Sequence, residues 1–255
     1  MTVRDLYDAA LIEINKLEAP SMLLEDYNYF INKAIQQYIN KVYNRYEINQ
    51  QATDDLISLR TSTTPKIEQN ALGEWYALLP DDYWHILNCV VVFDKQGESN
   101  NCKSTPNKAM YVARKLTADV EPAIINNAYF KPSYRVPYYK VLAELDSGSI
   151  LDMIVNPCDT EPDGNIHYRL HIECGDTSKY IPANAKVEYL KTPKKVSISE
   201  EDLYGIDNTD KMEFSDYVCY EIINEFTKLL LENTADPRLS TNVPINQTVI
   251  PQISE

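Results

Sequence analysis

The stretch Tyr27–Tyr46, YNYFINKAIQQYINKVYNRY, is the most regular pattern in the chain and decides the fold of its N-terminal part. Apolar residues recur in it at every third or fourth position, namely Tyr27, Ile31, Ala34, Ile35, Tyr38, Val42 and Tyr46. This spacing places them on one face of a helix about 30 Å long. The remaining positions form a polar side that contains Asn28, Asn32, Gln36, Asn40 and Asn44. We therefore predict a long amphipathic helix here.

Two further stretches have helical spacing. Near the N-terminus the apolar positions are Val3, Leu6, Ala10, Ile14 and Leu17, and Pro20 ends the run. Towards the C-terminus a wide apolar face over 215–233 contains Val218, Cys219, Ile222, Ile223, Phe226, Leu229 and Leu230. Ser215 can cap that closing helix. We expect the N-terminal helical pair and the closing helix to pack as a bundle, because each has an apolar face to bury.

The middle of the chain, from about residue 50 to 195, consists of short extended pieces. Strand-like stretches occur at 56–59, 75–78, 86–93, 166–174 and 186–190. Residues 150–155 are predicted to form a hairpin with 166–174, and 108–118 fit either a strand or a short helix. The sequence therefore predicts an α+β fold with a mainly antiparallel β middle region.

These patterns divide the chain into four parts. We predict that 1–49 forms the helical part of the bundle, 50–195 the β-rich region and 196–237 the closing helix of the bundle. After Pro237 only isolated apolar residues and two prolines remain. Residues 238–255 are therefore expected to be an extended arm, which can reach roughly 60 Å.

Charge and composition exclude several classes of function. The 255 residues include 24 Lys and Arg against 38 Asp and Glu, a net charge of −14, so the protein is not expected to grip nucleic acid. The six glycines are never spaced as in a phosphate-binding loop, which excludes dinucleotide-binding and P-loop folds. Five scattered cysteines without a CxxC motif indicate reduced thiols. With no apolar run of membrane-spanning length and no secretory signal, we expect assembly in the cytoplasm without membrane contact.

The sequence assigns no catalytic, cofactor-binding or metal-binding residue. His167 and His171 have the spacing of zinc ligands on a helix, but 166–174 alternates like a strand, on which the two imidazoles lie about 13 Å apart. We interpret them as part of a solvated strand face. Residues 159–164 begin like a calcium loop, but Leu170 stands where a bidentate glutamate is needed, so a hairpin turn is the better interpretation. We expect that the protein is not an enzyme.

Two stretches are candidates for contact with a partner. Residues 129–141 are aromatic and basic without an acid, and we rank protein contact first, glycan contact second and nucleic acid third. The second stretch is the arm after Pro237. The candidate contact residues are Tyr134, Tyr138 and Tyr139 in the first stretch and Leu239, Val243, Ile245, Val249 and Ile250 in the arm.

Three segments, in this order, resemble a known family. They are LPDDY at 79–83 before a predicted strand, VEYLKTP at 187–193 at a strand end, and the closing helix at 214–233. In these segments the chain resembles the head-to-tail connector proteins of tailed phages, the adaptor or gatekeeper group that includes podovirus tail tubular protein A. Its Gly-poor, Tyr- and Asn-rich composition is most similar to ring proteins of crAss-like phages that infect Bacteroides. The chain departs from the family in a closing helix rich in Ile and Leu rather than Ala, and in the Pro-containing arm.

The resemblance implies a structural virion protein of the neck or tail, assembled in the host bacterial cytoplasm. It implies a homo-oligomeric ring, usually twelvefold, docked beneath the portal protein and above the next tail ring or tail hub protein. Genomic DNA would pass through the lumen without specific binding, which agrees with the acidic balance. Two alternatives stay open. One is a glycan- or protein-binding module of a phage tail, and the other is a hydrolase with paired acids, for which no motif is present.

Overall fold

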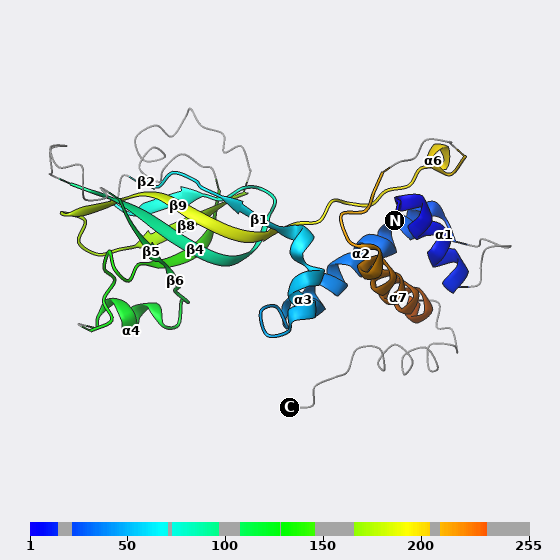
Figure 1. Ribbon diagram of the computed structural model, residues 1–255, viewed down its shortest axis with the longest axis horizontal. Helices are drawn as coiled ribbons and strands as arrows, with labels where there is room; N and C mark the ends of the chain where they lie inside the picture. Colours follow the sequence, from blue (N-terminus) through cyan, green and yellow to red (C-terminus); the bar gives the residue numbers. More distant parts are fainter. Residues whose placement is uncertain are drawn as a thin grey trace. The chain divides into compact units, whose positions relative to one another are not determined.

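The computed structural model describes residues 1–14, 22–70, 73–96, 108–127, 129–145, 166–204 and 210–233 (Figure 1). The chain divides into two compact units, a helical unit of residues 1–59 and 193–255 and a β unit of residues 60–192. The first boundary follows Leu59, not residue 49, because a short helix and a turn with the fully buried Leu56 and Leu59 belong to the helical unit. The second boundary follows Thr192, not residue 195.

The described α-helices of the helical unit are α1 (Val3–Glu13), α2 (Leu24–Tyr43), α3 (Gln50–Asp55), α6 (Glu200–Tyr204) and α7 (Asp216–Asn233). Both α1 and α2 pack against α7. Tyr27 of α2 is fully buried, and its ring centroid lies 4.8 Å from that of Tyr7 in α1 and 5.4 Å from that of Phe226 in α7. The predicted bundle is confirmed. Within the described residues, no helix combines the length and the apolar character needed to cross a bilayer.

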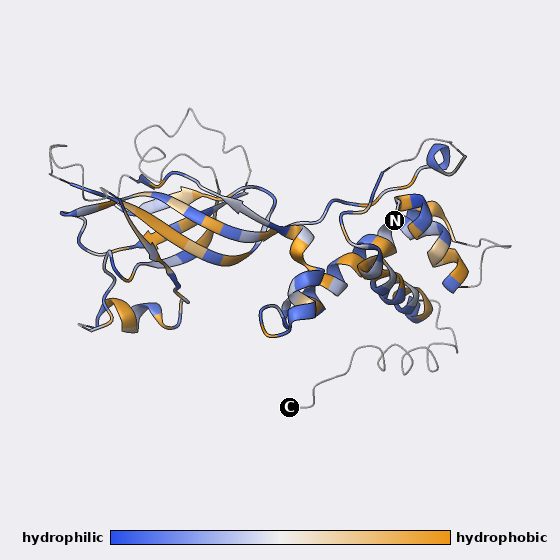
Figure 2. Cartoon of the chain, viewed as in Figure 1, coloured by the Kyte–Doolittle hydropathy of each residue, from blue (hydrophilic) through white to orange (hydrophobic). Residues whose placement is uncertain are grey.

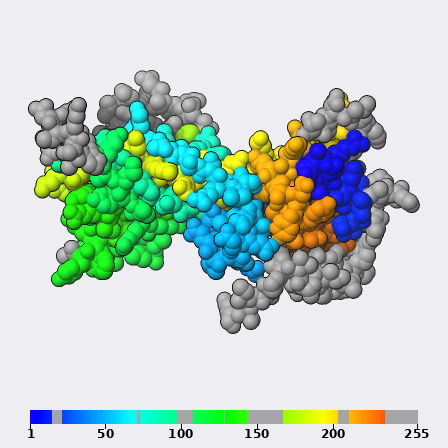
Figure 3. Space-filling model, viewed as in Figure 1, coloured from blue at the N-terminus to red at the C-terminus, as the bar shows by residue number. Residues whose placement is uncertain are grey.

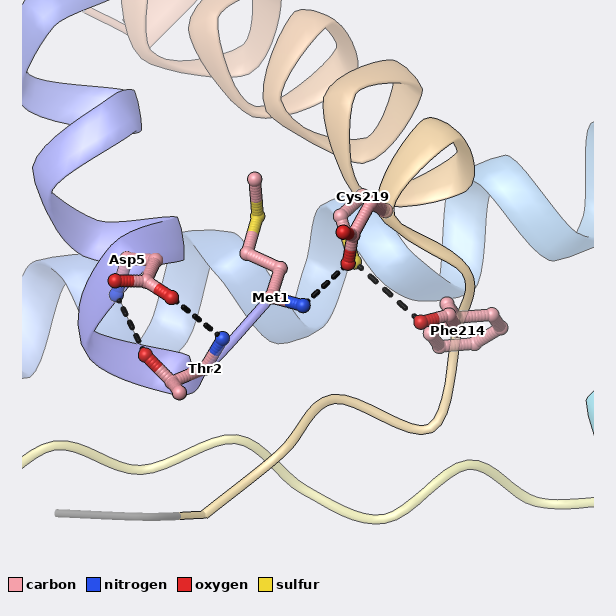
Figure 4. Close-up of polar contacts among 6 residues, drawn as sticks. Met1, Thr2, Asp5, Phe214 and Cys219 are labelled. Carbon is pink, nitrogen blue, oxygen red and sulfur yellow. Dashed lines mark hydrogen bonds and ion pairs between the residues drawn. The ribbon is translucent and has the colours of Figure 1, made fainter.

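The first residues of the chain join α1 to α7 (Figure 4). Thr2 caps α1, because its hydroxyl accepts a hydrogen bond from Asp5 N (3.1 Å) while Thr2 N donates to the Asp5 carboxylate (2.9 Å). The Met1 ammonium pairs with Asp216 at the start of α7, and this hydrogen bond raises the pKa of the ammonium. Val3 N also donates to Asp210 O at 2.9 Å. Backbone and side-chain contacts thus hold the two helix starts together.

The β unit contains two sheets. The first has the strand order β1 (Arg60–Thr63), β9 (Tyr180–Lys191), β4 (Tyr83–Lys95) and β5 (Lys108–Val112). The second has the order β2 (Glu68–Gln69), β3 (Trp75–Leu78), β8 (Ile166–Glu173), β7 (Tyr138–Leu145) and β6 (Arg114–Lys115). Every pairing is antiparallel except that of β6 with β7, and the short helix α4 (Glu121–Ile125) follows β6. The fold is α+β with mainly antiparallel sheets, as predicted.

The core of the β unit is built from the facing sides of the two sheets. Along β4 the alternating residues Cys89, Val91 and Phe93 are buried, and the β9 residues Ala185, Val187 and Tyr189 join the same cluster. The second sheet contributes Ala77, Leu170 and Ile172. Period-two alternation therefore decides which side chains enter the core, and apolar residues recur along the long strands in Figure 2.

Some predicted strands differ from the observed ones. Residues 56–59 do not form a strand, since Ile57–Leu59 is a 3-10 turn and the strand begins at Arg60. Leu56 and Leu59 are both buried, which is the three-residue spacing of a turn and not the alternation of a strand. Residues 108–118 form two short strands, β5 and β6. Strand β8 pairs with β3 and β7, while its predicted hairpin partner 150–155 and the arm 238–255 lie outside the described residues.

Candidate interaction surfaces

The two β-unit segments that carry the family resemblance bind each other. In the turn at 79–83, Tyr83 N donates to Pro80 O at 3.1 Å. The Tyr189 hydroxyl donates to Asp82 Oδ1 at 2.9 Å, and Thr192 donates to Asp82 O through its backbone N (2.7 Å) and its Oγ1 (2.8 Å). Burial and the contact with Asp82 raise the pKa of Tyr189 to about 12, so the hydroxyl stays a donor at neutral pH. We call Asp82, Tyr189 and Thr192 the motif contact.

The motif contact fixes backbone geometry at one end of the first sheet. It lies where β4 begins and β9 ends, so it ties the two long central strands of the first sheet at one end. It also sets the path on which the chain leaves the β unit after Thr192. Its role in this fold is structural.

An asparagine pair on α2 has a similar function in the helical unit. Asn28 accepts a hydrogen bond from Ile198 N (2.9 Å) and donates to Ile198 O (3.0 Å), and Asn32 does the same with Val196 N (2.9 Å) and O (2.7 Å). The four-residue step from Asn28 to Asn32 advances about 6 Å along the helix, close to the roughly 6.6 Å between alternate residues of an extended chain. The spacing therefore matches. Sequence analysis placed both asparagines on the polar side of the helix and missed this role.

Two of the predicted contact residues are not at the surface. Tyr138 and Tyr139 are buried, and because adjacent residues of a strand point to opposite faces, both faces of β7 are covered at this point. Neither ring is available to a partner in this fold, which corrects the prediction for these two residues. Tyr134 is half-buried, with its ring stacked on that of Tyr180 at 4.4 Å between centroids and edge-on to Tyr111 at 5.9 Å.

The exposed part of the aromatic, basic stretch is Tyr129–Arg135, which we call the aromatic loop. The side chains of Tyr129 and Phe130 are 94% and 59% exposed, and Lys131 is exposed beside them. Arg135 is also exposed, and its Nε donates to the Tyr134 hydroxyl at 3.0 Å. The contact residues predicted from the sequence did not include these exposed members of the stretch.

Close backbone packing anchors the aromatic loop. Gly175, after β8, has a φ of +67°, and a Cβ added there would collide with the carbonyl oxygen of Pro132. Ser133 and Val136 exchange backbone hydrogen bonds of 3.0 and 3.3 Å. The loop thus holds a defined path while its first two aromatic rings face solvent.

Further apolar side chains are exposed on strand β5, which contacts the aromatic loop through Tyr111 and Tyr134. Met110 and Val112 of β5 are 66% and 61% exposed. Residues of β5 and α4, green in the space-filling view, contribute to the visible surface of the β unit (Figure 3). Exposed aromatic, Met and Arg side chains are enriched in protein interfaces.

The helical unit presents a second surface, the tyrosine face, formed by Asp55 of α3 and by Tyr217, Tyr220 and Glu221 of α7. Tyr217 and Tyr220 are 48% and 58% exposed. The hydroxyl of the buried Tyr38 donates to Asp55 Oδ2 at 3.1 Å, and Gln51 binds the Tyr217 hydroxyl. These contacts join α2, α3 and α7 on this face.

The two carboxylates of the tyrosine face have raised pKa values, mainly because they are partly buried. Burial raises the pKa of Glu221, and Glu225 and Asp55 add to the rise while Lys41 opposes it. Burial and the neighbouring Asp54 raise the pKa of Asp55, against the hydrogen bond from Tyr38. Lys41 pairs with Glu225 at 2.6 Å. An added cation at this face would be favourable.

The three cysteines among the described residues are used in packing. Cys89, Cys174 and Cys219 are buried thiols, and burial raises their pKa to about 12, 12 and 11, so all three stay protonated at neutral pH. Across the described ranges, His, Cys, Asp and Glu side chains form no cluster of three that could hold a metal ion.

The two histidines of β8 have different environments. The ring of His171 is buried beside Tyr76, 6.5 Å between centroids, so the prediction of a solvated strand face is wrong for this residue. His171 lies between its two cross-strand neighbours, Tyr76 on β3 and Lys140 on β7, and these residues cover it. His167 Nδ1 lies 3.7 Å from Asp81 Oδ1 and remains partly exposed.

The five predicted contact residues of the arm, Leu239, Val243, Ile245, Val249 and Ile250, lie outside the described residues. A scan of protein-family models and a search of curated proteins find no match for this chain.

Proposed function

We propose that this protein is a structural subunit of the head-to-tail connector of a tailed phage. In this proposal it forms a ring, twelvefold as in the family it resembles, beneath the portal protein in the neck of the virion. The ring continues the DNA channel and docks the next tail component. The observation that carries the proposal is the motif contact.

The motif contact supports the resemblance in a specific way. Asp82 and Tyr189 are 107 residues apart in the chain, and each belongs to a different short segment that resembles the connector family. Two chance likenesses have no reason to meet in space. Segments that stabilise a shared fold are expected to contact each other. Here the two segments are joined by three hydrogen bonds.

The charge distribution supports a channel that DNA passes without adhering. The helical unit contains 21 acidic and 10 basic residues, and the β unit 17 and 14, so each unit is acidic. A DNA backbone near such surfaces is repelled at long range. We infer that the protein is not an enzyme, which fits the burial of Cys89, Cys174 and Cys219 and the structural use of Tyr189.

A protein-binding role is favoured over a glycan-binding one by the aromatic rings. The Tyr134 ring is stacked on that of Tyr180 at 4.4 Å and has the Arg135 guanidinium 5.5 Å from its centroid, so little of it is left to stack on a sugar. Tyr129 and Phe130, in contrast, are exposed, and aromatic side chains are enriched in protein interfaces.

Mass photometry tests the proposal directly. The full chain is measured alone, with the portal protein of the same genome, and with the portal of an unrelated phage as control. We expect a discrete complex of fixed stoichiometry that forms only with the cognate portal. A chain that ignores the cognate portal and binds in a glycan screen would contradict the connector role and favour the glycan-binding alternative.

A further inference from the structure

The two exposed surfaces of this chain are complementary in charge and in chemistry. The aromatic loop has two exposed rings, two cations and no acid between Tyr129 and Arg135. The tyrosine face has two exposed rings and two carboxylates. The cations of the aromatic loop can therefore pair with the carboxylates of the tyrosine face, and the exposed rings of the two surfaces can pack together.

Charge is distributed unevenly between the units, which favours contact between different units of two copies. The helical unit has an excess of 11 acidic residues, 21 against 10, while the β unit has an excess of 3, 17 against 14. The aromatic loop is a basic element on the less acidic unit. Its best partner by long-range attraction is a helical unit.

The aromatic loop is prepared for binding. Pro132 is buried, its carbonyl lies against Gly175, and the bridge between Ser133 and Val136 holds the following turn. Arg135 is oriented over the Tyr134 ring, with its guanidinium carbon 5.5 Å from the centroid. Little conformational entropy remains to be lost in this part of the loop on binding.

The tyrosine face is suited to receive cations together with aromatic rings. Tyr217, Tyr220 and Glu221 lie at positions i, i+3 and i+4 of α7, which form one stripe of a helix. Asp55 lies near this stripe and contributes to the raised pKa of Glu221. Aromatic side chains beside charge-assisted pairs are the usual centre of a tight contact.

We propose that the aromatic loop of one copy docks on the tyrosine face of a second copy, with Lys131 and Arg135 at Asp55 and Glu221. Tyr129 and Phe130 pack against Tyr217 and Tyr220 in this contact. It joins two different patches, so it is head-to-tail and can close into a ring. The inference rests on the proposed ring, for which it names the subunit interface.

Photocrosslinking in the full chain tests the contact without the portal. Benzoylphenylalanine replaces Tyr129 in unlabelled protein, which is mixed with ¹⁵N-labelled wild type and irradiated. We expect crosslinks from position 129 to labelled peptides of α3 or α7. The same probe at Lys186, exposed on β9, is the matched control and should not reach them. The inference would be overturned by crosslinks within a single copy only, by crosslinks to other regions of the labelled copy, or by the absence of crosslinks.

Charge reversal tests the ionic part of the contact. Lys131→Glu with Arg135→Glu in the probe-bearing copy should lower the crosslink yield roughly tenfold or more, because like charges then face each other. Glu221→Lys in the labelled copy should raise the yield again. Lys66→Glu with Lys186→Glu, the same charge change elsewhere on the β unit, should leave it unchanged.

The inference is overturned if the loop reversal has no effect, or if Glu221→Lys lowers the yield further. Failure of the proposed function is recognised separately, since binding to the cognate portal is measured in its own experiment. Crosslinks between the two surfaces in a chain that does not bind the cognate portal would support this inference and contradict the connector role.

Discussion

At the scale of single residues, Asp82 joins two distant segments with one side chain and one carbonyl. Its carboxylate holds Tyr189, and its backbone oxygen holds Thr192. Tyr189 is buried in the core between the sheets. Its hydroxyl is the only polar atom of its side chain, and it needs a hydrogen-bond partner there.

Replacing Tyr189 by Phe keeps the ring in the core and removes the donor to Asp82. We expect the free energy of unfolding to fall by about 1 kcal/mol, the usual value of such a hydrogen bond. Urea denaturation at pH 7 measures it. A variant as stable as the wild type would contradict a stabilising role for the motif contact.

Gly175 is required by the backbone around it. Gly175→Ala should cost about 2 kcal/mol or more, since a left-handed residue is strained and the new Cβ meets the Pro132 carbonyl. Gly73→Ala is the matched control. Gly73 also has positive φ, +86°, but the nearest atom to a Cβ is a Gln69 side-chain nitrogen at 3.6 Å.

Thermal unfolding of the two glycine variants separates strain from collision. Both should lower the melting temperature, and Gly175→Ala should lower it more. Equal effects would show that the Pro132 carbonyl does not constrain Gly175.

Sequence reasoning at this scale found regions but not contacts. Within the aromatic stretch, alternation alone could not tell that both faces of β7 are covered at Tyr138 and Tyr139. The Asp82–Tyr189 pair spans 107 residues, and the need for glycine at 175 comes from Pro132. Both depend on tertiary packing, which no local pattern records.

At the scale of elements, the asparagine pair attaches an extended segment to a helix. Val196 and Ile198 are buried, and their backbone groups bind the Asn32 and Asn28 amides. The pair thus does for this segment what a neighbouring strand does in a sheet.

Asn32→Ala should leave the N–H and C=O of Val196 without this partner and cost about 1–3 kcal/mol. Hydrogen exchange at Val196 should accelerate together with the loss of stability. Asn40→Ala, exposed on the same helix, should change stability by no more than about 0.5 kcal/mol. Similar effects of the two variants would contradict the role of the pair.

The acidic groups between α3 and α7 predict a pH dependence. The pKa of Glu221 is raised above its ordinary 4.5 in the folded state, so folded protein holds this proton more tightly than unfolded protein does. The stability from this group is present below pH 4.5 and is lost as the pH rises through the raised pKa.

Glu221→Gln should therefore stabilise the protein at pH 7, by up to about 0.5 kcal/mol, and should weaken the loss of stability between pH 4 and 7. Urea denaturation across that range measures both effects. A variant less stable than the wild type at pH 7 would contradict this account of the tyrosine face.

Long periodic elements were the most predictable part of the fold. The bundle follows from apolar stripes that extend over many residues, as in α2 and α7. The prediction of a strand at residues 56–59 was wrong, because a stretch of four residues is too short for its apolar pattern to distinguish a turn from a strand. Burial of Leu56 and Leu59 in the helical unit decided between the two.

At the scale of the whole molecule, the fold class could be predicted and the function could only be proposed. The order of helices and strands determines an α+β chain with two units, whereas the connector role rests on short motifs and their contact. The acidic excess of both units is consistent with a lumen that DNA passes freely.

Cryo-electron microscopy of the neck of the phage to which we propose this chain belongs tests the connector role most directly. We predict that a ring directly beneath the portal is accounted for by the helical unit and the β unit, with the aromatic loop of each subunit against its neighbour. A neck whose rings are all accounted for by other proteins, with this chain located elsewhere or missing from the virion, would contradict the proposal.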